Sequence, residues 1–471
     1  MQEGLDFCTA ASWRAVEQRV REFHAAQGGA SVAVGVIRGG RVIRSLFFGE
    51  PGLSEESAMR IASMTKSFTA CAVLRLRDEG KLRLDDEAVR YVPQMVHVGR
   101  ATRDSAAITV RNLLSMGSGL ATDDPWGDRM LDLTPDAFSR LLEQDAGRFA
   151  VAAGDAFEYS NLGYAVLGRI VTVVSGVPFQ EYITKRVLQP LGMHRTTWTA
   201  PPGTLLPADG APVLGDGEFA SMGGLFSCLR DLAIWVEFLG SAFPARDDPE
   251  DPALPLCRAS RREMQRVQQM TKEPVTRSAL GVVRATQLGY GFGIQVSHHY
   301  HFGSTAAHSG GLPGYGSHMR WWGLGGTGQL GLVGMANKTY AEVVTLLSLC
   351  QDELAAGWTA APATAAVVDS RNDLDAVIVR LLALAQWWND AHAQELFAFN
   401  VFLDHPDTRA EVAKLAGFMV LSVRHLSRTR AEAVLYKTGV PDMKLTVLLA
   451  PLKALKLQHW KCVPLVPLLN K

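Results

Sequence analysis

Residues 31–48 read SVAVGVIRGGRVIRSLFF, and this stretch decides the class of fold. Two β-rich runs flank Gly39-Gly40, and glycine readily accepts the positive φ angles of a tight hairpin turn. The stretch therefore predicts an antiparallel hairpin near the start of a chain of 471 residues.

Further strand signals lie much later in the chain. Four short runs bounded by glycine are YGFGIQVSHH (290–299), STAAHSGG (304–311), YGSHMRWW (315–322) and QLGLVGMAN (329–337). Their spacing is typical of an antiparallel meander. The intervening residues have mostly helical periodicity, interrupted by Gly and Pro. We therefore predict an α/β (α+β) fold in which both parts build one antiparallel sheet, with a helical subdomain inserted over roughly residues 85–225.

The composition changes after residue 355, where AAGWTAAPATAAVV is rich in Ala and Pro. We predict a first domain over residues 1–357, a linker over 358–371 and a small second domain over 372–471. The second domain begins with apolar residues at helical spacing and continues with strand-like runs, which predicts a small α+β domain. We recognise no catalytic or binding motif in this second domain, so its role is left open.

Bulk composition narrows the function classes. Acidic and basic residues balance at 47 each, so no net field attracts nucleic acid or an anionic membrane. The N-terminus lacks a basic segment followed by an apolar one, and no apolar run reaches the roughly 18 residues of a spanning helix. We therefore expect a cytoplasmic protein with neither nucleic-acid nor membrane partners. Six cysteines without regular spacing argue against a zinc site and a disulfide framework, and we expect no metal or cofactor.

The first candidate motif is Ser63-Met64-Thr65-Lys66, at the start of a helical run. Residues three apart share one helix face, so the two side chains can touch. A serine hydroxyl is a poor nucleophile at neutral pH, and a lysine whose pKa is lowered by burial can take its proton. The alternative is an exposed Ser/Lys pair without a catalytic role.

The second candidate is Tyr159-Ser160-Asn161, on a turn that leads into an apolar helix. Beside a lysine ammonium a tyrosine can be deprotonated more easily and relay a proton, while Asn161 can hold Lys66 and bind a substrate carbonyl. The alternative is a core tyrosine followed by a residue that caps the helix.

The third candidate exists in two versions, His308-Ser309-Gly310-Gly311 and Lys437-Thr438-Gly439. The first version ends a glycine-bounded strand, and two further strands follow it. Glycine would let a substrate backbone approach the strand, and the N–H groups of Gly311 and Ser63 could form an oxyanion hole.

These motifs, in this order, resemble those of the penicillin-recognising serine hydrolases. The branch in question contains class C β-lactamases, D,D-carboxypeptidases, D-aminopeptidases and family VIII carboxylesterases. The resemblance covers roughly residues 15–350 and includes the segments RIASMTKSFTACAVL, ITVRNLLSMGSGL, FEYSNLGYAVLGRIV, PLGMHRTTW, MGGLFSCLRDLAIWV, GYGFGI and HSGGLPGYGSHMRWW. It implies a β-lactamase/transpeptidase-like fold with the site in the groove between sheet and helical subdomain. In that family the third motif precedes the last two strands, so the resemblance favours His308 over Lys437.

The resulting hypothesis is a serine hydrolase that forms an acyl-enzyme on a small ester or peptide substrate. Ser63 attacks the carbonyl, Lys66 is the general base, and Tyr159 protonates the leaving group and later activates water. The predicted oxyanion donors are the amides of Ser63 and Gly311, and the predicted substrate-positioning residues are Asn161, His308, Ser309 and Gly310.

The third motif gives the main indication of the substrate class, and several alternatives stay open. The family's usual lysine at the third motif suits a substrate carboxylate, whereas histidine is mostly neutral at pH 7.5, so we expect small acyl esters rather than β-lactams. A D-stereospecific peptidase, a penicillin-binding-protein-like thioesterase acting as peptide cyclase or acyl transferase, and a catalytically silent binding scaffold remain alternatives. Oligomeric state is left open.

Overall fold

The computed structural model describes residues 9–124, 126–144, 147–271, 275–277, 283–299, 303–323, 329–356, 373–397, 407–427, 430–449 and 457–464. The chain divides into two compact units, Met1–Gly357 and Trp358–Lys471. The linker predicted at 358–371 lies outside the described residues.

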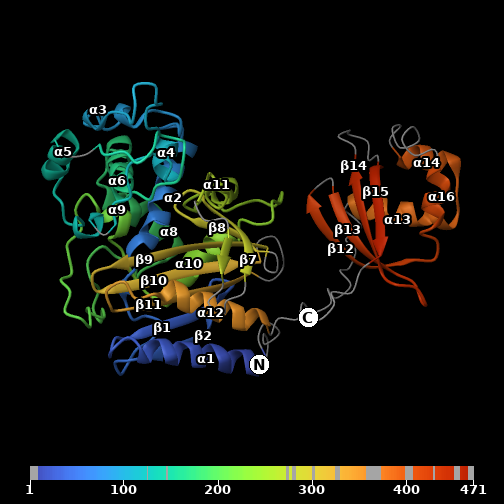
Figure 1. Ribbon diagram of the computed structural model, residues 1–471, viewed down its shortest axis with the longest axis horizontal. Helices are drawn as coiled ribbons and strands as arrows, with labels where there is room; N and C mark the ends of the chain where they lie inside the picture. The colour runs from blue at the N-terminus through green and yellow to red at the C-terminus, as the bar shows by residue number, and fades with distance from the viewer. Residues whose placement is uncertain are drawn as a thin grey trace. The chain divides into compact units, whose positions relative to one another are not determined.

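The predicted N-terminal hairpin is confirmed. Strands β1 (Val32–Arg38) and β2 (Arg41–Phe48) pair antiparallel around Gly39 and Gly40, whose φ angles are 56° and 71°. Strand β11 (Leu330–Ala336) pairs with the other edge of β1, with Val32 opposite Ala336. The two distant parts of the chain therefore share one antiparallel sheet, as expected (Figure 1).

The rest of this sheet comes from the later strands. Its order is β2-β1-β11-β10-β9-β8-β7-β5, and β6 pairs with β7. The further strands are β5 (Gln269–Met270), β6 (Val275–Arg277), β7 (Val283–Tyr290), β8 (Gln295–His299), β9 (Gly303–Leu312) and β10 (Tyr315–Trp322).

The prediction of a single strand over 290–299 was wrong. Tyr290 ends β7, and a turn containing Gly293 at φ 69° leads into β8 at Gln295. The aromatic and β-branched residues on both sides of the turn made the two strand ends look continuous. Strands β9, β10 and β11 lie where the sequence predicts them.

Helices cover both faces of the sheet. Helices α1 (Ala10–Ala25) and α12 (Val343–Ala356) pack together on one face, where they enclose Val32, Val34 and Val36 of β1. The alternate residues of β1 face the other side, toward α2 (Thr65–Asp78) and α10 (Leu229–Gly240). Because side chains alternate along a strand, one sheet supports two separate apolar cores. The larger core lies on the side of α2.

The helical subdomain packs against α2 and appears above the sheet in Figure 1. A two-stranded pair, β3 (Met59–Arg60) with β4 (Phe226–Ser227), links the residues just after this subdomain to those just before α2. Its helical elements are η2 (Ala88–Arg90), α3 (Met95–Val98), α4 (Val110–Leu114), η3 (Gly127–Arg129), α5 (Pro135–Gln144), α6 (Asn161–Ser175), α7 (Phe179–Ile183), η4 (Thr184–Leu188), α8 (Gln189–Leu191) and α9 (Ala220–Gly223).

Within the described residues, no single helix is long and apolar enough to cross a membrane. Helices α6 and α7–α8 pass such a test only together, across a bend of 76°. Most residues of α6 are buried in the core of the first unit.

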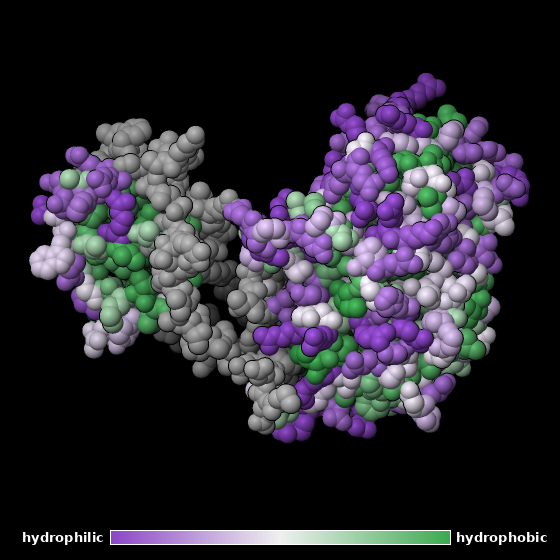
Figure 2. All heavy atoms as spheres, turned by 180° about the vertical axis from the view of Figure 1, so that it is seen from behind, coloured by the Kyte–Doolittle hydropathy of each residue, from purple (hydrophilic) through white to green (hydrophobic). Residues whose placement is uncertain are grey.

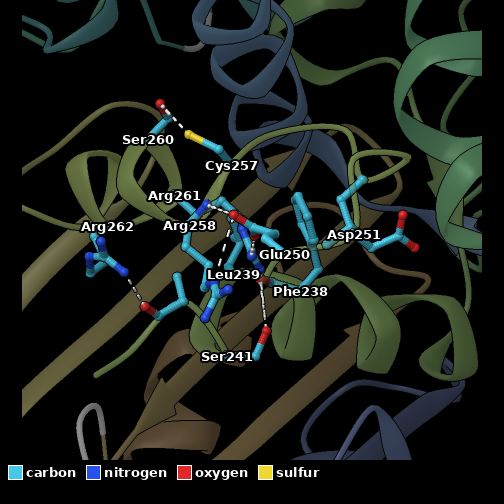
Figure 3. Close-up of polar contacts among 12 residues, drawn as sticks. Phe238, Leu239, Ser241, Glu250, Asp251, Cys257, Arg258, Ser260, Arg261 and Arg262 are labelled. Atoms are coloured by element: carbon cyan, nitrogen blue, oxygen red, sulfur yellow. Dashed lines mark hydrogen bonds and ion pairs between the residues drawn. The ribbon is translucent and has the colours of Figure 1, made fainter. Parts of the chain in front are cut away.

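Helix α11 (Arg258–Met264) is held to the end of α10 by arginine side chains (Figure 3). Arg261 donates to the carbonyl of Phe238 and forms an ion pair with Glu250, and Arg262 donates to the carbonyl of Ala242 at 2.7 Å. The last carbonyls of a helix lack partners within the helix, and here a neighbouring helix supplies donors.

The second unit has its own apolar core and a four-stranded antiparallel sheet, in the order β12-β13-β14-β15. Its elements are α13 (Asp373–Gln386), α14 (Asp390–Leu396), α16 (Thr408–Ala413), β12 (Met419–Ser427), β13 (Arg430–Tyr436), β14 (Met443–Leu449) and β15 (Leu457–Pro464). Helix α13 begins where the sequence predicts it. In Figure 2, hydrophilic residues cover much of the visible face of the first unit, between smaller hydrophobic groups.

Candidate active site

Ser63 and Lys66 meet at the start of α2. Ser63 lies in a single 3₁₀ turn, η1 (Ala62–Met64), and in this geometry side chains at i and i+3 eclipse each other. The Lys66 Nζ lies 2.9 Å from the Ser63 Oγ. Ala62, just before the serine, has φ +48°, an uncommon conformation for a residue with a Cβ. The pair is therefore presented by a tight, strained turn rather than by a regular helix.

The partners of Lys66 determine what its amine can do. Besides Ser63, its Nζ lies 2.7 Å from the Asn161 Oδ1 and 2.9 Å from the Met222 carbonyl oxygen. Both oxygens can only accept hydrogen bonds. A neutral amine has two N–H groups, which these two oxygens occupy, so its lone pair is directed at the Ser63 hydroxyl. This arrangement suits proton transfer from Ser63 to Lys66.

Burial raises the fraction of Lys66 that is a neutral amine. Lys66 has no exposed surface, and burial lowers the pKa of its amine to about 8, against the opposing effect of Asp124, Asp128 and Asp123. A buried lysine loses hydration of its charged form, whereas nearby carboxylates restore part of that stability.

Asn161 is positioned at the N-terminus of α6. Ser160 caps this helix by accepting from the Gly163 N–H at 3.0 Å, as the alternative interpretation of this motif predicted. The Asp123 carboxylate accepts from the Asn161 and Leu162 N–H groups at 2.7 and 2.8 Å. A carboxylate at a helix N-terminus is favourable because it pairs with free N–H groups.

The amide of Asn161 bridges two charged groups. Its oxygen accepts from Lys66, and its Nδ2 donates to the Asp124 carboxylate. Since lysine can only donate and a carboxylate only accept, the orientation of this amide is fixed. Asn161 is fully buried, so the structure places it behind Lys66 rather than on the wall of the cavity described below.

Tyr159 lies beside the catalytic pair. Its ring centre is 4.9 Å from the Lys66 Nζ, and its hydroxyl hydrogen-bonds with Ser63. Burial, together with Asp124, raises the pKa of Tyr159 well above its ordinary value, and the bond to Ser63 offsets this only in part. The expectation that the lysine eases deprotonation of Tyr159 is thus corrected: desolvation outweighs it, and the phenol stays protonated.

His308 stands on β9, next to the same pair. Its Nδ1 lies 2.7 Å from the Ser309 carbonyl oxygen, which can only accept, so Nδ1 carries the proton and Nε2 accepts from the Tyr290 hydroxyl at 2.9 Å. Burial, with a further contribution from Lys66, lowers the pKa of His308 to about 3. The ring is therefore neutral at physiological pH.

The glycines of β9 allow close packing. A Cβ on Gly310 would lie closer than 3.0 Å to the Ile61 carbonyl oxygen and the Ser317 hydroxyl, and one on Gly311 would meet the Tyr340 ring at 2.9 Å. Gly310 thus lets β9 approach the turn that precedes Ser63. Its backbone contact with a substrate stays a prediction, as do the oxyanion donors of Ser63 and Gly311.

A cavity of about 420 Å³ opens at Ser63. Of the predicted site residues, Ser63, Tyr159, His308, Ser309 and Gly311 line it. Lys66 and Asn161 lie behind this wall, bonded to each other, and Gly310 packs against Ile61.

Sequence reasoning missed four residues of the wall: Asp124, Asp128, Gln295 and Tyr340. The segment that contains the two aspartates was interpreted only as an interruption, marked by Gly and Pro, between helices. The acidic pair before Pro125 and the further Asp128 were a usable signal, but the other two residues carry no motif.

Lys437, the competing candidate, belongs to the second unit. It follows β13, donates to the Ala416 carbonyl at 2.9 Å and lies over the Phe418 ring. All its described partners come from that unit, whereas His308 contacts the surroundings of Ser63.

Comparisons with known proteins agree with this geometry. The sequence profile of the Beta-lactamase family matches residues 16–347. The D-alanyl-D-alanine-carboxypeptidase/endopeptidase AmpH of Escherichia coli (strain K12) is 30% identical over 237 residues, which are 48% of this chain and 61% of that protein. The chain thus matches about three fifths of the length of this relative.

Solved structures show the same fold. The octameric penicillin-binding protein homologue from Pyrococcus abyssi superimposes with a TM-score of 0.58 and 19% identity, covering 93% of this chain and 96% of its own. A D-stereospecific amidohydrolase from Streptomyces sp. superimposes with a TM-score of 0.54 and 23% identity, covering 72% and 97%.

Proposed function

This chain belongs to the Beta-lactamase family of serine hydrolases, which act on amide or ester bonds, and we propose that it is a carboxylesterase that forms an acyl-enzyme on Ser63 with small acyl esters. The observation that carries this proposal is the Lys66 amine, whose two acceptor-only partners leave its lone pair for the Ser63 hydroxyl.

Acylation begins with proton transfer. The Ser63 hydroxyl gives its proton to Lys66 as its oxygen bonds to the substrate carbonyl carbon, and the N–H groups of Ser63 and Gly311 stabilise the oxyanion. The C–O bond to the leaving alcohol then breaks. Tyr159 protonates that alcohol, and the proton on Lys66 replaces the one that Tyr159 gave. The acyl-enzyme is left with a neutral amine and a neutral phenol.

Deacylation repeats these steps with water. A water molecule gives a proton to the Lys66–Tyr159 pair and attacks the ester carbon, and the proton returns to Ser63 as the acid leaves. The side chains of Ser63, Lys66 and Tyr159 thus carry every proton transfer of acylation and deacylation.

The neutral His308 supports esters over β-lactams. A β-lactam antibiotic carries a carboxylate, and a lysine in the third motif would offer it a fixed cation. Here the imidazole is neutral and donates to Ser309 instead.

A D-stereospecific peptidase or amidohydrolase is the second candidate. AmpH is named as a carboxypeptidase, and the amidohydrolase from Streptomyces shares the fold. Acyl transfer to an amine, as in a penicillin-binding-protein-like thioesterase, would use the same acyl-enzyme with another acceptor. A cytoplasmic location stays part of the proposal.

Covalent labelling tests the nucleophile. Incubation with a fluorophosphonate, followed by intact mass measurement and peptide mapping, should show one adduct on Ser63. Ser63→Ala should abolish it. A folded wild-type protein without an adduct would refute the acyl-enzyme and favour a binding scaffold. A panel of p-nitrophenyl esters, D- and L-aminoacyl amides and nitrocefin then ranks the substrates.

Mutational coupling tests the base. Lys66→Ala and Ser63→Ala should each remove most of the turnover, and the double variant should be scarcely worse than either, because the two groups act as one unit. Near-normal kcat in a folded Lys66→Ala variant would exclude Lys66 as the base.

A further inference from the structure

Asp128 contributes an unsatisfied carboxylate to the wall of the Ser63 cavity. Its side chain is only 2% exposed. Its Oδ2 accepts from the Tyr340 hydroxyl at 2.9 Å, whereas its Oδ1 is buried and has no hydrogen-bond partner within the described residues. Leaving a buried acceptor without a donor is costly, most of all for a charged group. The wall of the cavity thus contains a carboxylate with one oxygen that has no donor within the described residues.

The position of Asp128 relates it to the reacting carbonyl. Tyr340 reaches from Gly311, where its ring would touch an added Cβ at 2.9 Å, to the Asp128 carboxylate. Asp128 therefore lies about one tyrosine ring from the strand that offers the predicted oxyanion donor. A donor bound to Asp128 would sit close to a carbonyl attacked by Ser63. Tyr340 itself has a φ of +49°, a left-handed backbone conformation that is uncommon for a residue other than glycine.

The charges of the cavity wall favour a cation. Asp124 and Asp128 both line the cavity, and no lysine or arginine is among its described lining residues. His308 is neutral, and the Lys66 nitrogen is already held by three oxygens. Burial, followed by the neighbouring Asp124, raises the pKa of Asp128 to about 6, so most of this carboxyl is ionised at pH 7.5.

We propose that Asp128 binds an ammonium group in the acyl part of the substrate, so that the enzyme prefers α- or β-amino acyl esters and amides to uncharged or anionic acyl donors. This proposal rests on the acyl-enzyme function of Ser63. It adds a specificity determinant outside the three motifs. The ammonium forms an ion pair with the Asp128 carboxylate, and Asp124 adds a second attractive charge. A carboxylate at the same position would be repelled.

Matched substrates test this preference. Alanine p-nitroanilide, in both D and L forms, differs from propionyl p-nitroanilide by an ammonium group in place of a hydrogen. The better alanine enantiomer should have a kcat/KM about ten- to a hundredfold higher, the range for a hydrogen bond to a charged group. Asp128→Asn should lower this ratio at least about tenfold. Asp136→Asn removes the same charge from an exposed site on α5 and should leave the ratio unchanged.

Two outcomes of this turnover assay would overturn the proposal: a ratio near one in the wild type, or a ratio that Asp128→Asn leaves intact. If Asp128→Asn does not fold, the ratio of kcat/KM values measured for the wild type still tests the proposal. The inhibition constant of 1-aminoethylboronic acid should be at least about tenfold lower than that of ethylboronic acid, since boronic acids bond to the nucleophilic serine. Equal constants would overturn the proposal.

Fluorophosphonate labelling separates this proposal from the one on which it rests. A protein that is labelled at Ser63 and hydrolyses p-nitrophenyl propionate, but does not prefer amino acyl substrates, would refute only the role of Asp128. A folded protein that is never labelled would refute both.

Discussion

Individual side chains in this site are constrained by which atoms can donate and which can accept. Around Lys66, the Asn161 and Met222 oxygens take two N–H groups and leave the third direction to Ser63. Around His308, the Ser309 carbonyl fixes the proton on Nδ1. Burial then sets the charge state, since it favours the neutral forms of Lys66, Tyr159 and His308 alike. Tyr159 and His308 are therefore neutral near pH 7, whereas the Lys66 amine, with a pKa of about 8, becomes mostly neutral only above pH 8.

The pH dependence of acylation follows from Lys66. Only the neutral amine accepts the serine proton, so kcat/KM for a neutral ester should rise with pH through about 8, by about tenfold between pH 7 and pH 9. His308 has a pKa of about 3 and should add no inflection between pH 5 and pH 9. Initial rates with p-nitrophenyl acetate, corrected for spontaneous hydrolysis, measure this profile. A flat profile from pH 6 to pH 9 would contradict the assignment of the base.

At the scale of elements, the site depends on how closely β9 approaches the start of α2. The Ser317 hydroxyl on β10 donates to the Ile61 carbonyl at 2.8 Å, and Gly310 on β9 leaves room for that contact. The sheet thereby fixes the turn that presents Ser63. Helix α6 fixes the other side through Asn161, so the nucleophile and its base are held between a strand and a helix.

Gly310→Ala tests the approach of β9. The added methyl group would overlap the Ile61 carbonyl oxygen, so we expect a loss of about 1–3 kcal/mol in the free energy of unfolding and slower labelling of Ser63. Gly215→Ala is the control, because its nearest neighbour would be the Asp132 Cβ at an ordinary 3.4 Å. Urea unfolding and fluorophosphonate labelling measure both effects. Equal behaviour of the two variants would show that the close approach is unimportant.

The two versions of the third motif can be tested directly. His308→Ala removes a neutral ring from the wall of the cavity and should lower kcat/KM about ten- to a hundredfold, or about 1.4–2.7 kcal/mol. Lys437→Ala should change it less than about twofold, because Lys437 bonds to Ala416 within the second unit. Loss of labelling only in the folded Lys437→Ala variant would reverse the assignment.

At the scale of the whole molecule, the chain separates into two units with separate cores. All predicted site residues and all residues that line the Ser63 cavity belong to the first unit. The two apolar cores on the faces of its sheet consist, within the described residues, of residues of the first unit. The chemistry is therefore expected to reside in Met1–Gly357.

Truncation tests this division. A chain that ends at Gly357 should fold and be labelled at Ser63 at a rate within about threefold of the full-length rate, because its described core and site are complete. Ser63→Ala in the truncated chain is the control for nonspecific labelling. A soluble, folded truncated chain that resists labelling would assign the second unit a direct role in the site.

The sequence by itself determined the features that depend on local spacing. The interval of three residues between Ser63 and Lys66 brings their side chains together in any helical turn, and the Gly39-Gly40 turn and the alternation of apolar residues define the hairpin. The resemblance to the penicillin-recognising serine hydrolases, whose third motif precedes the last two strands, also favoured His308 over Lys437. The Ser63–Lys66 contact and the hairpin depend on only a few neighbouring residues, so a short sequence motif is enough to predict them.

Tertiary structure alone decided which distant groups complete the site. The Met222 carbonyl that holds Lys66 belongs to a residue 156 positions away, and a backbone oxygen leaves no trace in the residue type. Asp128 and Tyr340 meet across 212 positions. Packing of the helical subdomain against the sheet brings them together, buries Lys66 and His308, and partly buries Tyr159. Their pKa values, and the unpaired carboxylate oxygen of Asp128, follow from that burial, which the spacing of residues in the sequence does not specify.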